Sequence, residues 1–257
     1  MADLTALIPG ISGEAVLFLV GTAFIAGLAR GFSGFGAALI FMPLASAVIE
    51  PARAAPLLLL VDAIMALGLI PNAWRRAERR NVGTMALGAL IGVPLGTAGL
   101  ALLDPLVVRW AVVAIVTMLL VLLVSGWRYR GQPYAALNAI IGVISGFFTG
   151  AAQVGGPPVV AYWLGGAIGR DVVRANIVLY FAISSAISIV SYLIGGLISL
   201  QILILTALIA SAYGLGLYLG ARLFGQAGDI LFRWICYGLI AMAAIISLPL
   251  LDPLLRG

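Results

Sequence analysis

The sequence contains no histidine and no lysine, and its only cysteine is Cys236. Without histidine the chain has no imidazole for haem or for the usual zinc sites, and it has no His-based catalytic triad. A single cysteine excludes an intramolecular disulfide and argues against a thiolate metal cluster. Clustered carboxylates are also lacking. These absences argue against an enzyme, and we expect neither a cofactor nor a metal.

Charge is scarce as well. Only 9% of the residues are charged, whereas 63% are hydrophobic and the mean hydropathy is +1.20. This leaves too little polar surface to cover a soluble globule of this length. Apolar runs of about 18 to 25 residues recur along nearly the whole chain, and they are longer than the roughly 10-residue strands of a membrane barrel. The predicted fold class is therefore an all-α, polytopic membrane protein.

All fourteen basic residues are arginines, and they lie mostly between the apolar runs. This distribution follows the positive-inside rule and does not indicate binding to nucleic acid, despite the net charge of +5. The link 74–80 carries four arginines and is assigned to the cytoplasm, which places ten of the fourteen arginines on that side. Both termini are then predicted to be extracytoplasmic. The N-terminal residues 1–13 lack a basic n-region, so we expect the first helix to be retained.

Turn signals and charges divide the chain into two repeats joined by a cytoplasmic linker at 127–133. Each repeat is predicted to hold one hairpin and three spans. Repeat 1–126 contains hairpin 15–49 and spans 54–72, 82–103 and 106–126. Repeat 134–257 contains hairpin 134–168 and spans 175–195, 200–222 and 232–251. The hairpin arms, at about 14 to 17 residues, are short for a hydrocarbon core of about 30 Å. Each pair is interpreted as a re-entrant hairpin, and two short tilted spans stay open as the alternative.

Glycine spacing relates the two halves. Gly27, Gly31 and Gly36 match Gly146, Gly150 and Gly155 at one constant offset. The motif Gly92-Val93-Pro94-Leu95-Gly96 likewise matches Gly216-Leu217-Tyr218-Leu219-Gly220, and for these two motifs we expect close helix packing. An odd number of crossings in each half starts the second half on the opposite face. The sequence therefore predicts two inverted-topology repeats, which is a transporter architecture.

The two hairpins are interrupted by glycine-rich stretches at 30–36 and 146–158. Non-helical backbone at membrane depth persists only where it faces protein or a water-filled cavity. The second arms should begin at about 34–36 and 155–157, with free N–H groups and glycines that allow close approach of a ligand. We therefore expect the two tips to meet near the membrane midplane and to bind an anion.

Polar side chains near the tips sharpen this expectation. The Arg30 guanidinium matches an oxyanion, and Ser33, Thr149 and Gln153 add neutral donors. Asp62 is a carboxylate within the third apolar segment, and two roles stay open for it: a salt bridge with Arg30, or transport of a coupling proton. Elsewhere, Glu50 and Asp171 are expected to cap the helices that follow them.

The stretch Gly31-Phe32-Ser33-Gly34-Phe35-Gly36-Ala37-Ala38-Leu39-Ile40-Phe41-Met42-Pro43-Leu44 is followed half a chain later by Gly155-Gly156-Pro157-Pro158. Together they resemble the twin signature of the TauE/SafE family of membrane permeases, which are sulfite exporters. The family motif maps onto Gly31, Ser33, Gly34, Gly36, Gly155, Gly156 and Pro157, whereas Arg30 and Gln153 are assigned on physical grounds alone. Through length, duplicated halves and motif placement the resemblance extends over essentially the whole chain.

The resemblance implies transport of sulfite or of an organosulfonate such as sulfoacetate, and we expect the chain in a bacterial inner membrane. Our interpretation is a secondary transporter or exporter that works by alternating access, with proton or potential coupling left open. Its expected partners are the anion and the lipid bilayer, with no nucleic acid, and a homodimer stays open. The alternatives are a passive anion channel, with flux above about 10⁵ ions per second, a permease for another small organic anion, and a non-transporting membrane scaffold.

Overall fold

The computed structural model describes residues 11–33, 36–164, 169–224 and 229–251. Within these ranges the chain forms helices and no β-strand. The elements are α2 (Gly13–Ser33), α3 (Ala37–Ile49), α4 (Pro51–Ala66), the 3₁₀ helix η1 (Leu67–Leu69), α5 (Ile70–Arg76), α6 (Arg79–Leu102), α7 (Pro105–Ser125), α8 (Ala135–Ala152), α9 (Gly156–Trp163), α10 (Arg170–Ile194), α11 (Leu200–Phe224), α12 (Asp229–Ile246) and the 3₁₀ helix η2 (Pro249–Leu251).

Seven helical segments in the described residues are long and apolar enough to cross a membrane. They are Gly13–Gly31, Pro51–Arg76, Arg79–Leu102, Pro105–Ser125, Ala135–Ala152, Asp171–Ile194 and Leu200–Leu223. The helix α3 and the apolar part of α12, Trp234–Ile246, are shorter. The lengths and composition confirm the predicted class, a multi-pass helical membrane protein.

The hairpin arms differ from the prediction. The first arm of each pair was expected to be too short to span, but α2 has 21 residues and α8 has 18. The short arms are the second ones, since α3 has 13 residues and α9 has 8. The helix α2 continues through the glycine-dense stretch to Ser33 because its glycines pack against another helix. The next helix, α3, begins at Ala37.

The first predicted span, 54–72, is also longer than expected and reaches Arg76 through a change of helix type at η1. Pro71 explains the interruption. Its nitrogen has no hydrogen for an i−4 bond, and its ring clashes with the carbonyl of Leu67 in a regular α-helix. The helix therefore tightens at Leu67–Leu69 and restarts with Pro71 in the first turn of α5.

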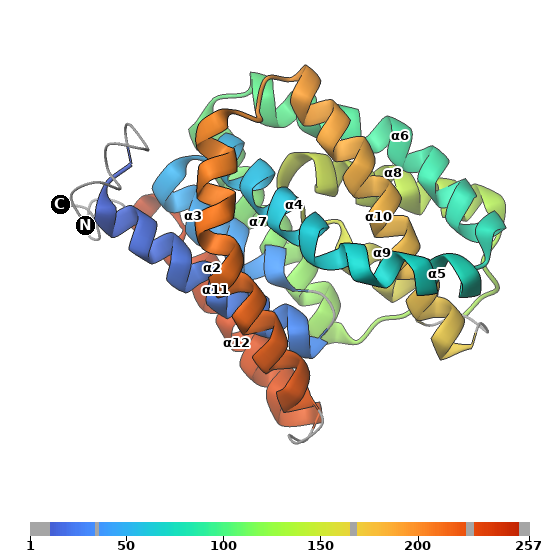
Figure 1. The fold of residues 1–257 in the computed structure, drawn as a ribbon. Coiled ribbons are helices and arrows are strands. Elements are labelled where there is room, and N and C mark those ends of the chain that lie inside the picture. The colour runs from blue at the N-terminus through green and yellow to red at the C-terminus, as the bar shows by residue number, and fades with distance from the viewer. Residues whose placement is uncertain (1–10, 34–35, 165–168, 225–228, 252–257) are drawn as a thin grey trace.

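Figure 1 shows two groups of helices, with α2, α11 and α12 on one side and α6, α8 and α10 on the other. The helices α4 and α7 lie between them. Two clusters of buried apolar side chains match this division. The larger is built mainly from α2, α3, α4, α7, α11 and α12, and the smaller from α5, α6, α9 and α10.

Glycines hold two pairs of helices in backbone contact. On α2, a Cβ atom added at Gly31 would meet the carbonyl oxygen of Leu217 on α11. On α6, a Cβ atom at Gly92 would meet the carbonyl oxygen of Val143 on α8, and the reverse contact joins Gly150 to Val93. Only a residue without a side chain permits this approach. The packing role predicted for the Gly92 motif is confirmed.

The two pairs of helices in glycine contact correspond to each other under the predicted repeat. The helix α2 belongs to the first half and packs on α11 of the second, whereas α8 of the second half packs on α6 of the first. By the sequence matches, α2 corresponds to α8, and α6 corresponds to α11. In each predicted half, the first helix therefore packs against the corresponding helix of the other half, and glycines form the contact.

We predict that Gly92→Ala destabilises the protein by about 1–3 kcal/mol, because the new methyl group overlaps the α8 backbone. Gly83→Ala is the matched control on the same helix, since nothing lies within 4 Å of its added Cβ. That control should be neutral or stabilising by up to about 1 kcal/mol, because alanine has less backbone freedom to lose on folding. Thermal unfolding in detergent measures both, and equal midpoints would contradict the packing argument.

Candidate functional site

The first helix break lies between Ser33 and Ala37. Gly36 precedes α3 with φ 104°, in the left-handed region that favours glycine, and no side chain caps the first turn of α3. The second arm thus begins where the sequence predicted, with uncapped N–H groups. Gly34 and the side chain of Ser33 lie outside the described residues.

A three-residue polar cluster lies just before this break. The Nη1 atom of Arg30 is 2.7 Å from the Oδ2 atom of Asp62, and the hydroxyl of Tyr213 donates a 2.6 Å hydrogen bond to Asp62 Oδ1. The three residues come from α2, α4 and α11. Of the two roles left open for Asp62, the structure contains the salt bridge with Arg30.

The packing of α2 on α11 creates this cluster. A Cβ atom at Gly27 would touch the carbonyl oxygen of Tyr213, so the two backbones meet one turn before Arg30. Tyr213 is fully buried, whereas the Arg30 and Asp62 side chains are 25% and 24% exposed. The pair offsets the cost of placing an arginine among apolar helices. A guanidinium has five N–H donors. Because the salt bridge uses the Nη1 atom, other N–H groups of Arg30 can donate to a second acceptor.

Sequence reasoning did not find Tyr213. The available signal was its position on α11, one turn before Gly216 of the packing motif, which places it on the same face of the helix. A tyrosine near an apolar segment is more often an interfacial anchor, and nothing in the sequence alone paired this one with Asp62. The tertiary contact decides its role.

The second break is held by hydrogen bonds within the protein. Gln153 ends α8 with φ 57°, and its Nε2 atom donates to Thr149 O at 3.0 Å and to the hydroxyl of Tyr192 at 3.1 Å. The Tyr192 hydroxyl in turn donates to Gly150 O at 2.8 Å. These bonds satisfy carbonyls that the end of a helix leaves without partners.

Close approach also shapes the start of α9. The hydroxyl of Ser145 donates to Gly155 O at 2.7 Å, and the hydroxyl of Thr149 donates to Ser145 O at 2.8 Å. A Cβ atom at Gly155 would collide with the Thr149 hydroxyl. Gly155 and Pro157 are buried, and Gly156 is partly buried. In this conformation the donors of Thr149 and Gln153 serve the protein backbone.

The two breaks are chemically different. By the repeat matches, Thr149 stands at the position of Arg30, Ile183 at that of Asp62 and Ala89 at that of Tyr213. The charged pair of Arg30 and Asp62 therefore belongs to the first half, and the positions that match the three cluster residues are neutral. Direct approach of the two tips, expected from the sequence, stays a prediction.

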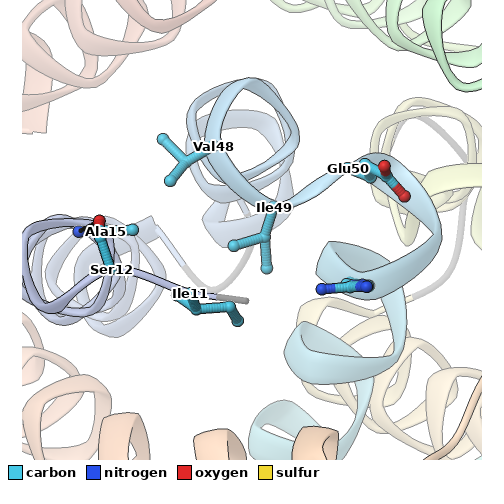
Figure 2. A pocket seen from close by; sticks show the side chains of 7 residues that line it. Ile11, Ser12, Ala15, Val48, Ile49 and Glu50 are labelled. Carbon is cyan, nitrogen blue, oxygen red and sulfur yellow. Dashed lines mark hydrogen bonds between the residues drawn. The ribbon is translucent and has the colours of Figure 1, made fainter. Parts of the chain in front are cut away.

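A recess of about 510 Å³ opens at the other end of α2. Figure 2 shows Ser12 and Ala15 on one side of it and Ile49 and Glu50 on the other, and Arg53 completes its polar lining. Ala15 and Arg30 are about 22 Å apart along α2 at 1.5 Å per residue. The recess is thus remote from the charged cluster.

The expected capping by Glu50 is wrong in detail. Glu50 occupies the residue before α4, with φ 67°, but its side chain makes no capping hydrogen bond. Its carbonyl oxygen accepts from the amides of Arg53 and Ala54 instead. Asp171 lies in the first turn of α10, where a carboxylate interacts favourably with the helix dipole.

The family model for the sulfite exporter TauE/SafE matches residues 19–247. The chain belongs to the TauE/SafE family. The match covers both helix breaks and all three residues of the charged cluster, and it confirms the resemblance drawn from the glycine motifs. TauE/SafE membership suggests a membrane transporter of sulfite or related anions. No curated protein and no solved structure matches the chain.

We predict that Tyr213→Phe lowers stability by about 2 kcal/mol, because Asp62 loses a hydrogen bond to a charged group. Tyr218→Phe is the matched control on the same helix. The Tyr218 side chain is exposed, and Arg222 lies over its ring, a contact that phenylalanine keeps. Thermal unfolding in detergent should leave the control within about 0.5 kcal/mol of the parent. An equal loss in both variants would argue against the Asp62 bond.

Proposed function

We propose that the chain is a secondary transporter that exports a small sulfur-containing anion, sulfite or an organosulfonate such as sulfoacetate. The observation that carries the proposal is a partly exposed arginine, Arg30, fixed by Asp62 within a membrane-spanning helix and next to a glycine-rich break. Placing an arginine among membrane-spanning helices costs free energy, so such residues usually have a function. Its forked donors match the oxygens of a sulfonate or sulfite group.

The proposal places two inverted repeats around the site. Reciprocal packing of α2 on α11 and of α8 on α6 supports this arrangement. If the two halves are exchanged, the pair α8 and α6 takes the place of the pair α2 and α11. The arginine distribution supports extracytoplasmic termini in a bacterial inner membrane. Alternating access would then move one half against the other around the site.

The proposed anion site combines Arg30 with the residues of both tips. At the first tip Gly31, Ser33, Gly34 and Gly36 precede α3 along the chain, and the N–H groups in the first turn of α3 would attract an anion. The second tip would contribute Thr149, Gln153, Gly155, Gly156 and Pro157. Because the side-chain donors of Thr149 and Gln153 are hydrogen-bonded within the protein in this conformation, their part in binding requires a rearrangement of the second tip.

Asp62 would control access to Arg30. The Asp62 carboxylate occupies one nitrogen of the Arg30 guanidinium and repels an approaching anion, so an anion would bind more tightly when Asp62 is protonated or when Arg30 turns away from it. The bond from Tyr213 would hold Asp62 in place while Arg30 turns to the substrate. A negative interior also favours anion export, by about 2.3 kcal/mol per charge for each 100 mV. This scheme supports coupling to protons or to the potential.

Transport of radiolabelled sulfite in proteoliposomes tests the role of Arg30. We expect Arg30→Ala to lower the flux about tenfold to a hundredfold, since it removes hydrogen bonds to a charged ligand. Arg53→Ala is the control, because Arg53 is an exposed arginine at the remote recess. Flux that survives Arg30→Ala would remove Arg30 from the site.

The pair Arg30→Gln and Asp62→Asn separates binding from folding. Each single change leaves a charge without its partner and should destabilise the protein, whereas the double variant carries no orphaned charge and should recover much of the loss. The double variant should nevertheless transport no sulfite. Recovery of both stability and flux in the double variant would contradict a substrate role for Arg30.

A thermal-shift series identifies the substrate class. The purified protein is titrated with sulfite, sulfate, thiosulfate, sulfoacetate and taurine, with acetate as the carboxylate control. A true ligand stabilises by about 2.7 kcal/mol at a hundred times its dissociation constant, and the shift grows with concentration. We expect sulfite or sulfoacetate to shift the midpoint and acetate to leave it unchanged. Stabilisation by acetate alone would argue for another organic anion.

A further inference from the structure

A row of polar side chains runs along the buried face of α10. Its members are spaced four residues apart and are all fully buried: Asn176, Tyr180, Ser184, Ser188 and Tyr192. Residues at this spacing form one ridge of a helix. The ridge is about 24 Å long, most of the thickness of the hydrocarbon core. We call these five residues the α10 donor row.

The two ends of the donor row are tied to features already described. At one end the Oδ1 atom of Asn176 accepts a 2.7 Å hydrogen bond from the amide of Glu78, in the arginine-rich link between α5 and α6. At the other end Tyr192 bonds the carbonyl of Gly150 at the second tip. The donor row therefore connects the predicted cytoplasmic face with the second helix break.

Between these ends, polar groups lack hydrogen-bond partners. The hydroxyls of Ser184 and Ser188 and the Nδ2 atom of Asn176 are buried without a partner. The Tyr180 hydroxyl lies near Ser145 and Ser184, yet it meets the geometry of a hydrogen bond with neither. Buried donors in a native fold normally have partners, so a group of unpaired ones needs an explanation.

Neighbouring helices add two more such donors. The Thr97 hydroxyl on α6 is buried without a partner, and its methyl group lies beside Gly195, just past the end of the row. The Nε1 atom of Trp163 on α9 is also unpaired, and its ring packs edge-on against Tyr180 at 6.1 Å. An indole N–H can only donate.

Ordinary helix chemistry does not account for these hydroxyls. A buried serine or threonine in a helix commonly bonds the carbonyl four residues earlier. Thr149 and Thr206 make that bond, at 2.8 Å and 2.7 Å. Ser184, Ser188 and Thr97 do not. Their hydroxyls are thus available to a ligand. None of the five residues of the donor row is a carboxylate, and the carboxylate of Glu78, at the Asn176 end, is bonded by Asn81.

We propose that the α10 donor row lines an oxyanion path through the second half, in which hydroxyl, amide and indole donors bind the oxygens of sulfite or of a sulfonate. The inference rests on the proposed function and adds to it a route between the second tip and the cytoplasmic face. Neutral donors hold an anion more weakly than a guanidinium does. Several weak sites in series allow an anion to enter and also to leave.

Cysteine accessibility tests the path without relying on transport. Ser188→Cys and, as a lipid-facing control on the same helix, Val190→Cys are made in a Cys236→Ala background and reconstituted into vesicles. The probe is (2-sulfonatoethyl) methanethiosulfonate, whose sulfenyl sulfur is attacked by the thiolate with release of methanesulfinate. We expect Ser188→Cys to react at least about tenfold faster than Val190→Cys, because only a wetted thiol ionises.

Two outcomes of this labelling would overturn the proposal. If Ser188→Cys reacts no faster than Val190→Cys, water does not reach the donor row. If it reacts with the neutral hydroxyethyl reagent but not with the sulfonate, the row holds water and excludes anions.

Sulfite flux gives a second readout. We expect Ser184→Ala combined with Ser188→Ala to lower the flux about tenfold or more while the unfolding midpoint stays equal or rises, because an unpaired buried hydroxyl does not stabilise the fold. Ser211→Ala on the exposed face of α11 is the control. Unchanged flux in the double variant, with flux still sensitive to Arg30→Ala, would refute the path alone. Absence of sulfite flux and of anionic labelling in every protein would refute the proposed function and the path together.

Discussion

Backbone contact through glycine is the constraint on which the rest of the structure depends. Glycines on α2, α11, α6 and α8 let two pairs of helices approach until carbonyl oxygens lie where a Cβ atom would be. In a membrane the apolar effect does not drive helices together, so such close contact is a main source of association. Both contacts join a helix of one predicted half to a helix of the other, and the first of them brings Tyr213 of α11 beside α2, which carries Arg30.

The same contacts give the halves different chemistry. Packing of α2 on α11 brings Tyr213 to Asp62 and fixes the salt bridge with Arg30. The equivalent packing of α8 on α6 is surrounded by neutral groups, and the second tip is closed by hydroxyl, amide and carbonyl bonds. The charged cluster around Arg30 and the neutral donor row on α10 are thus different features, and neither is the repeat counterpart of the other. In the proposed cycle the first would select the anion, and the second would let it pass.

Much of the fold was predictable because it follows from composition and length. Long apolar runs have only one way to satisfy their backbone in lipid, so the helices and their approximate bounds came from the sequence. The breaks at Gly36 and Gly155 were predictable as well, since glycine clusters and Pro157 interrupt a helix. The unequal arms were not, because Gly27 and Gly31 continue α2 only through contact with α11.

The sequence by itself determined a helical membrane protein with two glycine-rich breaks, and it predicted two related halves and placed Arg30 and Asp62 within apolar segments, because these are properties of residue type and spacing. Only the tertiary structure decided that Asp62 pairs with Arg30, that Tyr213 joins them, and that Gln153 and Thr149 bond their own backbone. Partners in these interactions lie up to 151 residues apart along the chain, as Tyr213 and Asp62 do. No local pattern encodes such a distance, and helix packing alone brings the groups together.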